Sequence, residues 1–224
     1  MRWLTAAAIF VFSVALFAAL IFLPAGRIDW TAGWLCLAVM TIGFSAVTAH
    51  VVARTPSLIR RRTKPGKGTP LWDLVLVPIF QLAFVAVLVV GGLDAGRHPG
   101  NAAPVWLQIL GLAAMIAAMF LLGWAMGSNP HFEATVRIQS DQHHRVIDSG
   151  PYRIVRHPGY AAAIPLLSGM ALVLGSFWAL VPALIGNLGL IVRTVLEDRF
   201  LQERLDGYAA YARRTPYRLV PGVW

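Results

Sequence analysis

The chain has 224 residues, of which 58% are hydrophobic and 13% are charged. Soluble domains carry roughly 25% charged residues, so this composition argues against a soluble protein. The formal net charge is +9, but the basic residues lie between long apolar runs, where they can face the cytosol and anionic lipid head groups. We therefore expect an integral membrane protein with membrane lipids around it and no nucleic-acid partner.

The apolar runs predict six membrane-spanning helices, most of them near the roughly 20 residues that cross the hydrocarbon layer. In chain order they cover residues 3–23, 31–53, 71–93, 104–126, 159–174 and 176–196. The fifth run is short and follows Pro158-Gly159, and only a tight hairpin fits between the fifth and sixth runs. The predicted fold class is an all-α, polytopic membrane helical bundle with a cytosolic C-terminal helix or tail.

The distribution of basic residues predicts the orientation of the bundle. The loops after the first and third runs hold only Arg27 and Arg97, whereas the segment after the second run carries six basic residues and no acid: Arg54, Arg60, Arg61, Arg62, Lys64 and Lys67. Positive loops stay in the cytosol. We therefore expect a multi-pass protein of the bacterial inner membrane, with both termini and residues 127–158 in the cytosol.

Polar side chains gather in the last 100 residues. We therefore divide the chain into a scaffold of four spans at residues 1–126 and a core that carries the chemistry at residues 127–224. His50 is the one candidate in the scaffold, and a single His at a helix end is more often structural. Cys36 is the only cysteine and lies in an apolar run, so we expect no disulfide, no thiolate ligand and no metal site.

Residues 150–160, which we call the elbow, read Gly-Pro-Tyr-Arg-Ile-Val-Arg-His-Pro-Gly-Tyr. Gly-Pro favours a turn, and the proline at 158 biases His157 away from helix. Non-helical backbone at this depth persists only where it is buried in protein or lines a cavity. The elbow thus indicates either a cavity wall with free backbone groups for a ligand or an interfacial belt of Tyr and Arg that anchors a helix end.

A second cluster lies at the end of the sixth run. Arg193 and Glu197 are four residues apart and share a helix face, and the neighbours of Arg193 are apolar. Glu197 and Asp198 point about 100° apart, so one can face the bundle while the other faces water. A solvated helix end suits Asp198, and residues 196–213 predict one amphipathic helix on the cytosolic side.

Together, the elbow, the Arg193-x-x-x-Glu197-Asp198 helix end and the tail resemble the isoprenylcysteine carboxyl methyltransferase family, which is related to the membrane phospholipid methyltransferases. The tail contributes Tyr208, Tyr211, Tyr217-Arg218 and Pro221-Gly222. The resemblance covers about residues 120–224, and Arg-His-Pro-x-Tyr at 156–160 is its most specific element. Residues 128–139 are similar to a bacterial branch of the family.

The resemblance implies a membrane enzyme that binds S-adenosylmethionine in a cytosol-facing pocket and takes a lipophilic acceptor from the bilayer. It implies Arg193 and Glu197 as the catalytic residues. The expected cofactor contacts are Val155, Arg156, His157, Pro158, Tyr160 and Glu197. The expected acceptor contacts are Asn129, Phe132 and Arg193. The sequence departs from the family at Asp198, where the family has Glu, which shortens the reach of this acid by one methylene.

The acceptor chemistry follows from the residues available. Methyl transfer from a sulfonium is an in-line displacement, so the enzyme must align the reactants and exclude water. A carboxylate acceptor needs no general base, whereas an amine or thiol must lose a proton. Arg193 suits an anionic acceptor and Glu197 suits an amine. We expect methylation of a carboxylate on a small lipophilic acceptor, with a phospholipid amine or a thiol as the alternative.

Two other classes of membrane protein fit less well. A bis-histidine haem site needs two facing histidines within the spans, and only His50 is suitably placed. A transporter usually shows two similar halves, each with broken helices, whereas here the polar residues lie in one half. A non-catalytic transporter or scaffold is therefore the weaker alternative to a methyltransferase.

Overall fold

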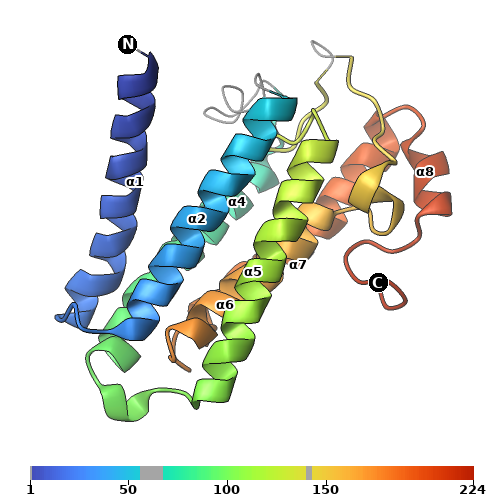
Figure 1. Cartoon of the computed structure of the whole chain (residues 1–224). Coiled ribbons are helices and arrows are strands. Elements are labelled where there is room, and N and C mark those ends of the chain that lie inside the picture. The colour runs from blue at the N-terminus through green and yellow to red at the C-terminus, as the bar shows by residue number, and fades with distance from the viewer. Residues whose placement is uncertain (1, 56–67, 140–142) are drawn as a thin grey trace.

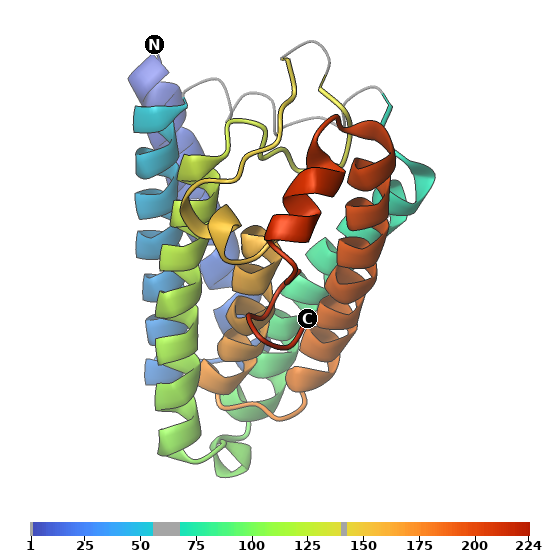
Figure 2. The same cartoon turned by 90° about the vertical axis from the view of Figure 1, so that its right-hand side faces the viewer.

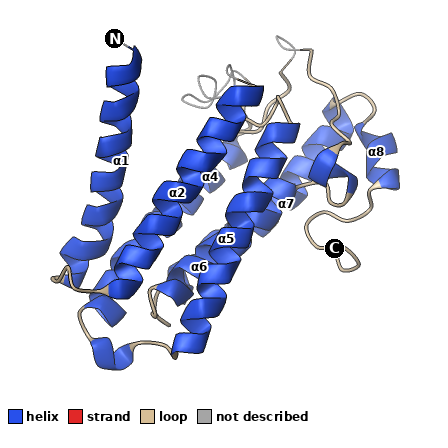
Figure 3. Cartoon of the chain, in the orientation of Figure 1, coloured by secondary structure: helices blue, strands red, loops and turns tan. Residues whose placement is uncertain are grey.

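The computed structural model describes residues 2–55, 68–139 and 143–224, and helices are the regular structure throughout these segments (Figures 1 and 3). The main helices are α1 (Arg2–Ala25), α2 (Thr31–Arg54), α4 (Leu71–Gly91), α5 (Val105–Ser128), α6 (Pro158–Val173), α7 (Leu180–Arg204) and α8 (Tyr208–Arg214). A π-helical turn, Gly92–Gly96, extends α4, and 3₁₀ turns form at Pro99–Asn101 and Gly150–Arg153. The predicted all-α membrane bundle is confirmed.

Five helices are long and apolar enough to cross a membrane, within residues 7–25, 31–54, 71–96, 105–128 and 180–204. The predicted fifth span, α6, is apolar but has 16 residues, which rise about 24 Å, less than the roughly 30 Å hydrocarbon core. The predicted sixth span begins four residues late, at Leu180, and continues to Arg204, because Gly175 turns the chain with a φ of +74° before α7 can start.

The helices run alternately up and down (Figure 1). The start of α1, the ends of α2, α5 and α7, and all of α8 lie at one end of the bundle, and the turn after α1 and the turn after α4 lie at the other (Figures 1 and 2). This grouping agrees with the predicted orientation, in which the start of α1 and the ends of α2 and α5 lie on the same side of the membrane (Figure 1). The basic residues Arg60, Arg61, Arg62, Lys64 and Lys67 lie outside the described residues.

Close helix packing supports the region where the polar residues gather. α5 packs along α6, and α4 packs along α7. Gly111 of α5 and Gly169 of α6 allow the first pair to touch through backbone, because a Cβ on either glycine would lie 2.8 Å from the carbonyl oxygen of the other. Small residues at such contacts are the usual means of helix association in membranes. This contact fixes the position of α6, which contributes residues to the candidate functional site.

The predicted single helix over residues 196–213 is wrong. α7 ends at Arg204, and Gly207 reverses the chain with a φ of +82° before α8 begins at Tyr208. A separate apolar cluster explains the break, since Leu205, Tyr208 and Tyr211 bury themselves against Tyr152 of the elbow. α8 therefore folds back over the elbow (Figure 2).

Candidate functional site

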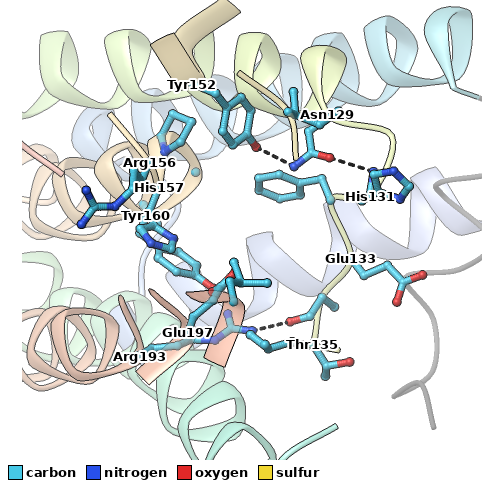
Figure 4. A pocket seen from close by; sticks show the side chains of 18 of the residues that line it. Asn129, His131, Glu133, Thr135, Tyr152, Arg156, His157, Tyr160, Arg193 and Glu197 are labelled. Atoms are coloured by element: carbon cyan, nitrogen blue, oxygen red, sulfur yellow. Dashed lines mark hydrogen bonds between the residues drawn. The ribbon is translucent and has the colours of Figure 1, made fainter. Parts of the chain in front are cut away.

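A cavity of about 360 Å³ lies where the elbow, α6, α7 and the segment after α5 meet (Figure 4). Polar side chains from the elbow, from α7 and from residues 129–139 line one part of it. Apolar side chains from α2, α4 and α5 line another part: Phe44, Val77, Phe80, Phe84 and Leu122. The same cavity is thus lined by charged side chains in one part and by apolar side chains of the membrane-spanning helices in another.

The elbow begins with the 3₁₀ turn Gly150–Arg153. Its backbone is then irregular, as predicted, up to His157, which precedes α6 with φ −123° and ψ 61°. Its backbone is nevertheless occupied within the protein. The N–H of Arg156 donates to the carbonyl of Tyr217 at 2.9 Å, and the N–H of His157 donates to that of Arg218 at 3.0 Å. The N–H of Val155 bonds to Pro151 at 3.2 Å. The backbone donors of Arg156 and His157 are therefore used to hold the tail, and that of Val155 is used within the elbow.

Asp198 is fully buried, which corrects the expectation of a solvated residue. Its carboxylate accepts hydrogen bonds from Arg156 Nε (2.8 Å) and Nη2 (3.0 Å), from the Tyr208 hydroxyl (3.0 Å) and from Arg218 Nε (3.0 Å). Gln202 Nε2 donates to it at 3.0 Å. Because α8 and the tail fold back over α7, water is replaced by these donors. The burial of Tyr208, with Asp198 beside it, raises the pKa of that phenol, so its hydroxyl remains a donor.

Arg156 closes the same cluster from the elbow. While Nε and Nη2 hold Asp198, Nη1 donates to the carbonyl oxygens of Thr215 at 2.8 Å and Pro216 at 2.9 Å. All three guanidinium nitrogens thus bind protein groups. Its expected contact with the cofactor stays a prediction, since the side chain joins the elbow, α7 and the tail.

Arg193, Tyr160 and Glu197 meet at the cavity (Figure 4). The guanidinium carbon of Arg193 lies 5.1 Å from the centre of the Tyr160 ring, a distance typical of a cation–π contact. The Tyr160 hydroxyl donates to Glu197, and the His157 ring lies parallel to that of Tyr160 with centroids 5.7 Å apart. The predicted catalytic pair therefore shares one cavity wall, joined through an aromatic ring.

Sequence analysis missed the partner of Arg193. Asp73, in the first turn of α4, is fully buried and accepts from Arg193 Nε at 2.7 Å. The two residues are 120 positions apart, so no local spacing connects them. The available signal was an acid inside the apolar run 71–93, because a charge within a span usually has a partner or a function.

The segment after α5 forms the wall that faces α7. Asn129 donates through Nδ2 to the Tyr152 hydroxyl at 3.1 Å and accepts at Oδ1 from the His131 N–H at 2.8 Å (Figure 4). The Phe132 ring packs on Gly159 so closely that a Cβ there would approach it to 2.5 Å. Asn129 and Phe132 both line the cavity. Their position is compatible with contact to an acceptor, which stays a prediction.

His144 also lines the cavity, at a position that sequence analysis did not single out. Its Nδ1 accepts from the Gln139 N–H at 3.3 Å, and its ring lies 4.6 Å from that of His131. Burial, together with the positive fields of His131 and Arg137, lowers the pKa of His144 to about 4. The imidazole is therefore neutral at pH 7.

The structure brings nearly all of the predicted site residues to this cavity: Asn129, Phe132, Arg156, His157, Pro158, Tyr160, Arg193 and Glu197. Val155 is the exception, since it is buried beside the cavity without lining it. His50 lies at the end of α2 with an exposed side chain and does not line it either. Among the described residues, no group of three or more His, Cys, Asp or Glu is arranged to hold a metal ion.

Residues 106–206 match the family model of phospholipid methyltransferases. The match runs from α5 to the end of α7, so it includes the elbow, Arg193, Glu197 and Asp198, and it confirms the resemblance to membrane methyltransferases. Together, the apolar helices and this match support a multi-pass membrane protein of the methyltransferase class.

One curated relative is similar to this chain over about half of its length. The cobalt-zinc-cadmium resistance protein CzcN of Cupriavidus metallidurans is 28% identical over 107 residues, which are 47% of this chain and 49% of that protein. The alignment thus spans about half the length of the curated relative.

Proposed function

We propose that the protein transfers a methyl group from S-adenosylmethionine to a carboxylate on a lipophilic acceptor that enters from the bilayer. One observation carries the proposal: the cavity that holds Arg193, Tyr160 and Glu197 continues into apolar side chains of α2, α4 and α5. Its volume of about 360 Å³ lies within the range of roughly 300–1,000 Å³ that is common for small-molecule sites.

The residues present fit the donor. When bound, S-adenosylmethionine would supply the methyl group of its sulfonium to the acceptor oxygen. Tyr160 and His157 offer aromatic faces, and Glu197 offers a carboxylate, for the sulfonium and the ammonium of the amino-acid part. Ala163 and Gly159 also line the cavity.

Arg193 fits an anionic acceptor. Its Nε and Nη2 bind Asp73 and Nη2 also binds the Ala134 carbonyl, whereas Nη1 has no hydrogen-bond partner among the described residues. A carboxylate at Nη1 would present an oxygen to the methyl group and would need no general base. The protein's own part in the reaction is then alignment of the two reactants and exclusion of water.

A second candidate has one observation in its favour. The charge of Arg193 is already paired with Asp73 at 2.7 Å. Glu197, which accepts from Tyr160, is a carboxylate beside it at the cavity. A carboxylate in that place could accept the proton of an amine or thiol acceptor. Methylation of a lipid amine or a thiol is therefore the alternative reaction at the same site.

Calorimetric titration of the detergent-purified protein with S-adenosylmethionine and S-adenosylhomocysteine tests donor binding. We expect both to bind, and absence of binding would contradict the methyltransferase proposal. Labelled donor should then be offered with prenylcysteine analogues, fatty acids, lipid amines and thiols. A base-labile methyl ester is the expected product, whereas a methylated amine or thioether would replace the carboxylate proposal with its alternative.

We also propose that the cavity end of the bundle faces the cytosol of a bacterial cell. Cysteines introduced at Arg54 and at Arg97, both exposed residues at opposite ends, test the orientation in a Cys36→Ala background. An impermeant thiol reagent added to intact cells should label the cysteine at 97 and spare the one at 54. The reverse labelling would invert the orientation.

A further inference from the structure

Asp73 stands apart from the other residues of the site. It belongs to α4, outside residues 106–206 that carry the family match, and its side chain has no exposed surface. Isolating a carboxylate from water is unfavourable unless good partners compensate. The burial of Asp73 therefore depends on the partners of its two carboxylate oxygens.

Both oxygens of Asp73 are used at the cavity wall. Oδ1 accepts from Arg193 Nε at 2.7 Å, and Oδ2 accepts from Arg193 Nη2 at 3.3 Å and from the N–H of Val136 at 2.7 Å. Arg193 Nη2 in turn donates to the carbonyl of Ala134 at 2.9 Å. One carboxylate thus fixes the Nε–Nη2 edge of the guanidinium and, with it, the backbone of residues 134–136.

We propose that Asp73 is a positioning residue for methyl transfer, which sets the direction of the Arg193 guanidinium toward the acceptor. The inference rests on the proposed function. A planar guanidinium held along one edge by a carboxylate loses its rotational freedom. Nη1 therefore keeps a fixed direction, while the guanidinium carbon stays 5.1 Å from the centre of the Tyr160 ring. Asp73 itself touches neither reactant and acts through Arg193.

A purely structural tie between α4 and α7 would have a different signature. Loss of such a tie would lower stability and would affect donor binding and turnover alike. Loss of a positioning residue should lower turnover while donor affinity stays nearly normal, because the donor meets Tyr160 and Glu197 rather than Asp73. The separation of these two quantities distinguishes the two roles.

The test compares Asp73→Asn and Asp73→Glu with the control Asp29→Asn. Asp29 forms an ion pair with Arg27 at 2.8 Å at the opposite, exposed end of the bundle, so its loss should change nothing at the cavity. Asp73→Asn keeps the shape but places an amide among donors. We expect its turnover to fall at least about tenfold, while S-adenosylhomocysteine affinity stays within about threefold.

Asp73→Glu keeps the negative charge and tests the same inference if Asp73→Asn does not fold. Its turnover should lie between those of the wild type and Asp73→Asn. Since Asp73 acts through Arg193, adding Asp73→Asn to Arg193→Lys should cost less than about twofold further, a non-additive result. Hydrogen exchange at residues 134–136 should rise in Asp73→Asn and stay unchanged in Asp29→Asn.

Three results would overturn the inference: normal turnover in both Asp73 variants, equal losses of turnover and donor affinity, or additive losses in the double variant. Failure of the proposed function would look different, because the wild type itself would then bind no S-adenosylhomocysteine. Hydrogen exchange would still test whether Asp73 fixes the backbone of residues 134–136. Unchanged exchange there in Asp73→Asn would contradict this role, and increased exchange would support it.

Discussion

Asp198 of α7 binds Arg156 of the elbow through both carboxylate oxygens, at 2.8 and 3.0 Å, and the two side chains are at most 5% exposed. Removing one member of such a pair leaves a buried charge without compensation. We expect Asp198→Asn to lower the free energy of unfolding by about 3–5 kcal/mol. Thermal unfolding in detergent measures this, with Glu203→Gln as an exposed control on the same helix. Equal midpoints for Asp198→Asn and the wild type would show that the pair adds no stability.

His157 and Tyr160 should contribute to donor binding more than to folding. Their rings lie parallel at the cavity. We therefore expect His157→Ala and Tyr160→Ala each to lower the affinity for S-adenosylhomocysteine at least about tenfold, roughly 1.4 kcal/mol. Calorimetry measures the affinity. Ile154→Ala is the matched control, since Ile154 belongs to the elbow but is half exposed and does not line the cavity. Unchanged affinity in both variants would return the elbow to the role of an interfacial anchor.

Arg193 and Glu197 should show different kinetic signatures. Glu197→Gln keeps the shape and removes the charge, so it should weaken binding of the cationic donor. Arg193→Lys keeps the charge but loses the planar fork, so it should lower turnover at least about tenfold, roughly 1.4 kcal/mol, with nearly normal donor affinity. Steady-state kinetics with the identified acceptor and calorimetry separate the two effects. Wild-type values for both variants would remove this helix end from the active site.

The low pKa of His144 predicts acid sensitivity of the cavity wall. The pKa is about 4 in the folded protein and 6.5 in its ordinary state, so between these values the unfolded chain binds more protons and stability falls as pH decreases. We expect the melting temperature to drop between pH 6.5 and 4. His144→Gln cannot take up that proton, and its melting temperature should fall less over this interval. Equal pH dependence of the two proteins would place the acid sensitivity elsewhere.

Periodicity and charge predicted the fold well because the lipid core demands long apolar helices. The boundaries failed where local turns decide. Gly175 delays α7, and Gly207, with the apolar cluster around Tyr208, ends the expected helix at Arg204. A hydrophobic pattern alone cannot show that a charged helix end will be covered by the chain that follows it.

The site was predicted where its residues are neighbours in sequence and was missed where they are not. The elbow and the face shared by Arg193 and Glu197 follow from local spacing, and both line the cavity. Asp73 pairs with Arg193 across 120 positions, and Asp198 meets Arg156 across 42. Such pairs depend on which helices become neighbours, and no pattern within one segment contains that information.

The contact between the elbow and the tail also sets an order of events during synthesis. Arg156 leaves the ribosome 59 and 60 residues before the carbonyls of Thr215 and Pro216 that its Nη1 binds. At a rate of synthesis of about 5–20 residues per second, those partners are made several seconds after Arg156. The cavity wall that Arg156 joins to the tail is therefore completed only after α6 and α7 have been synthesised.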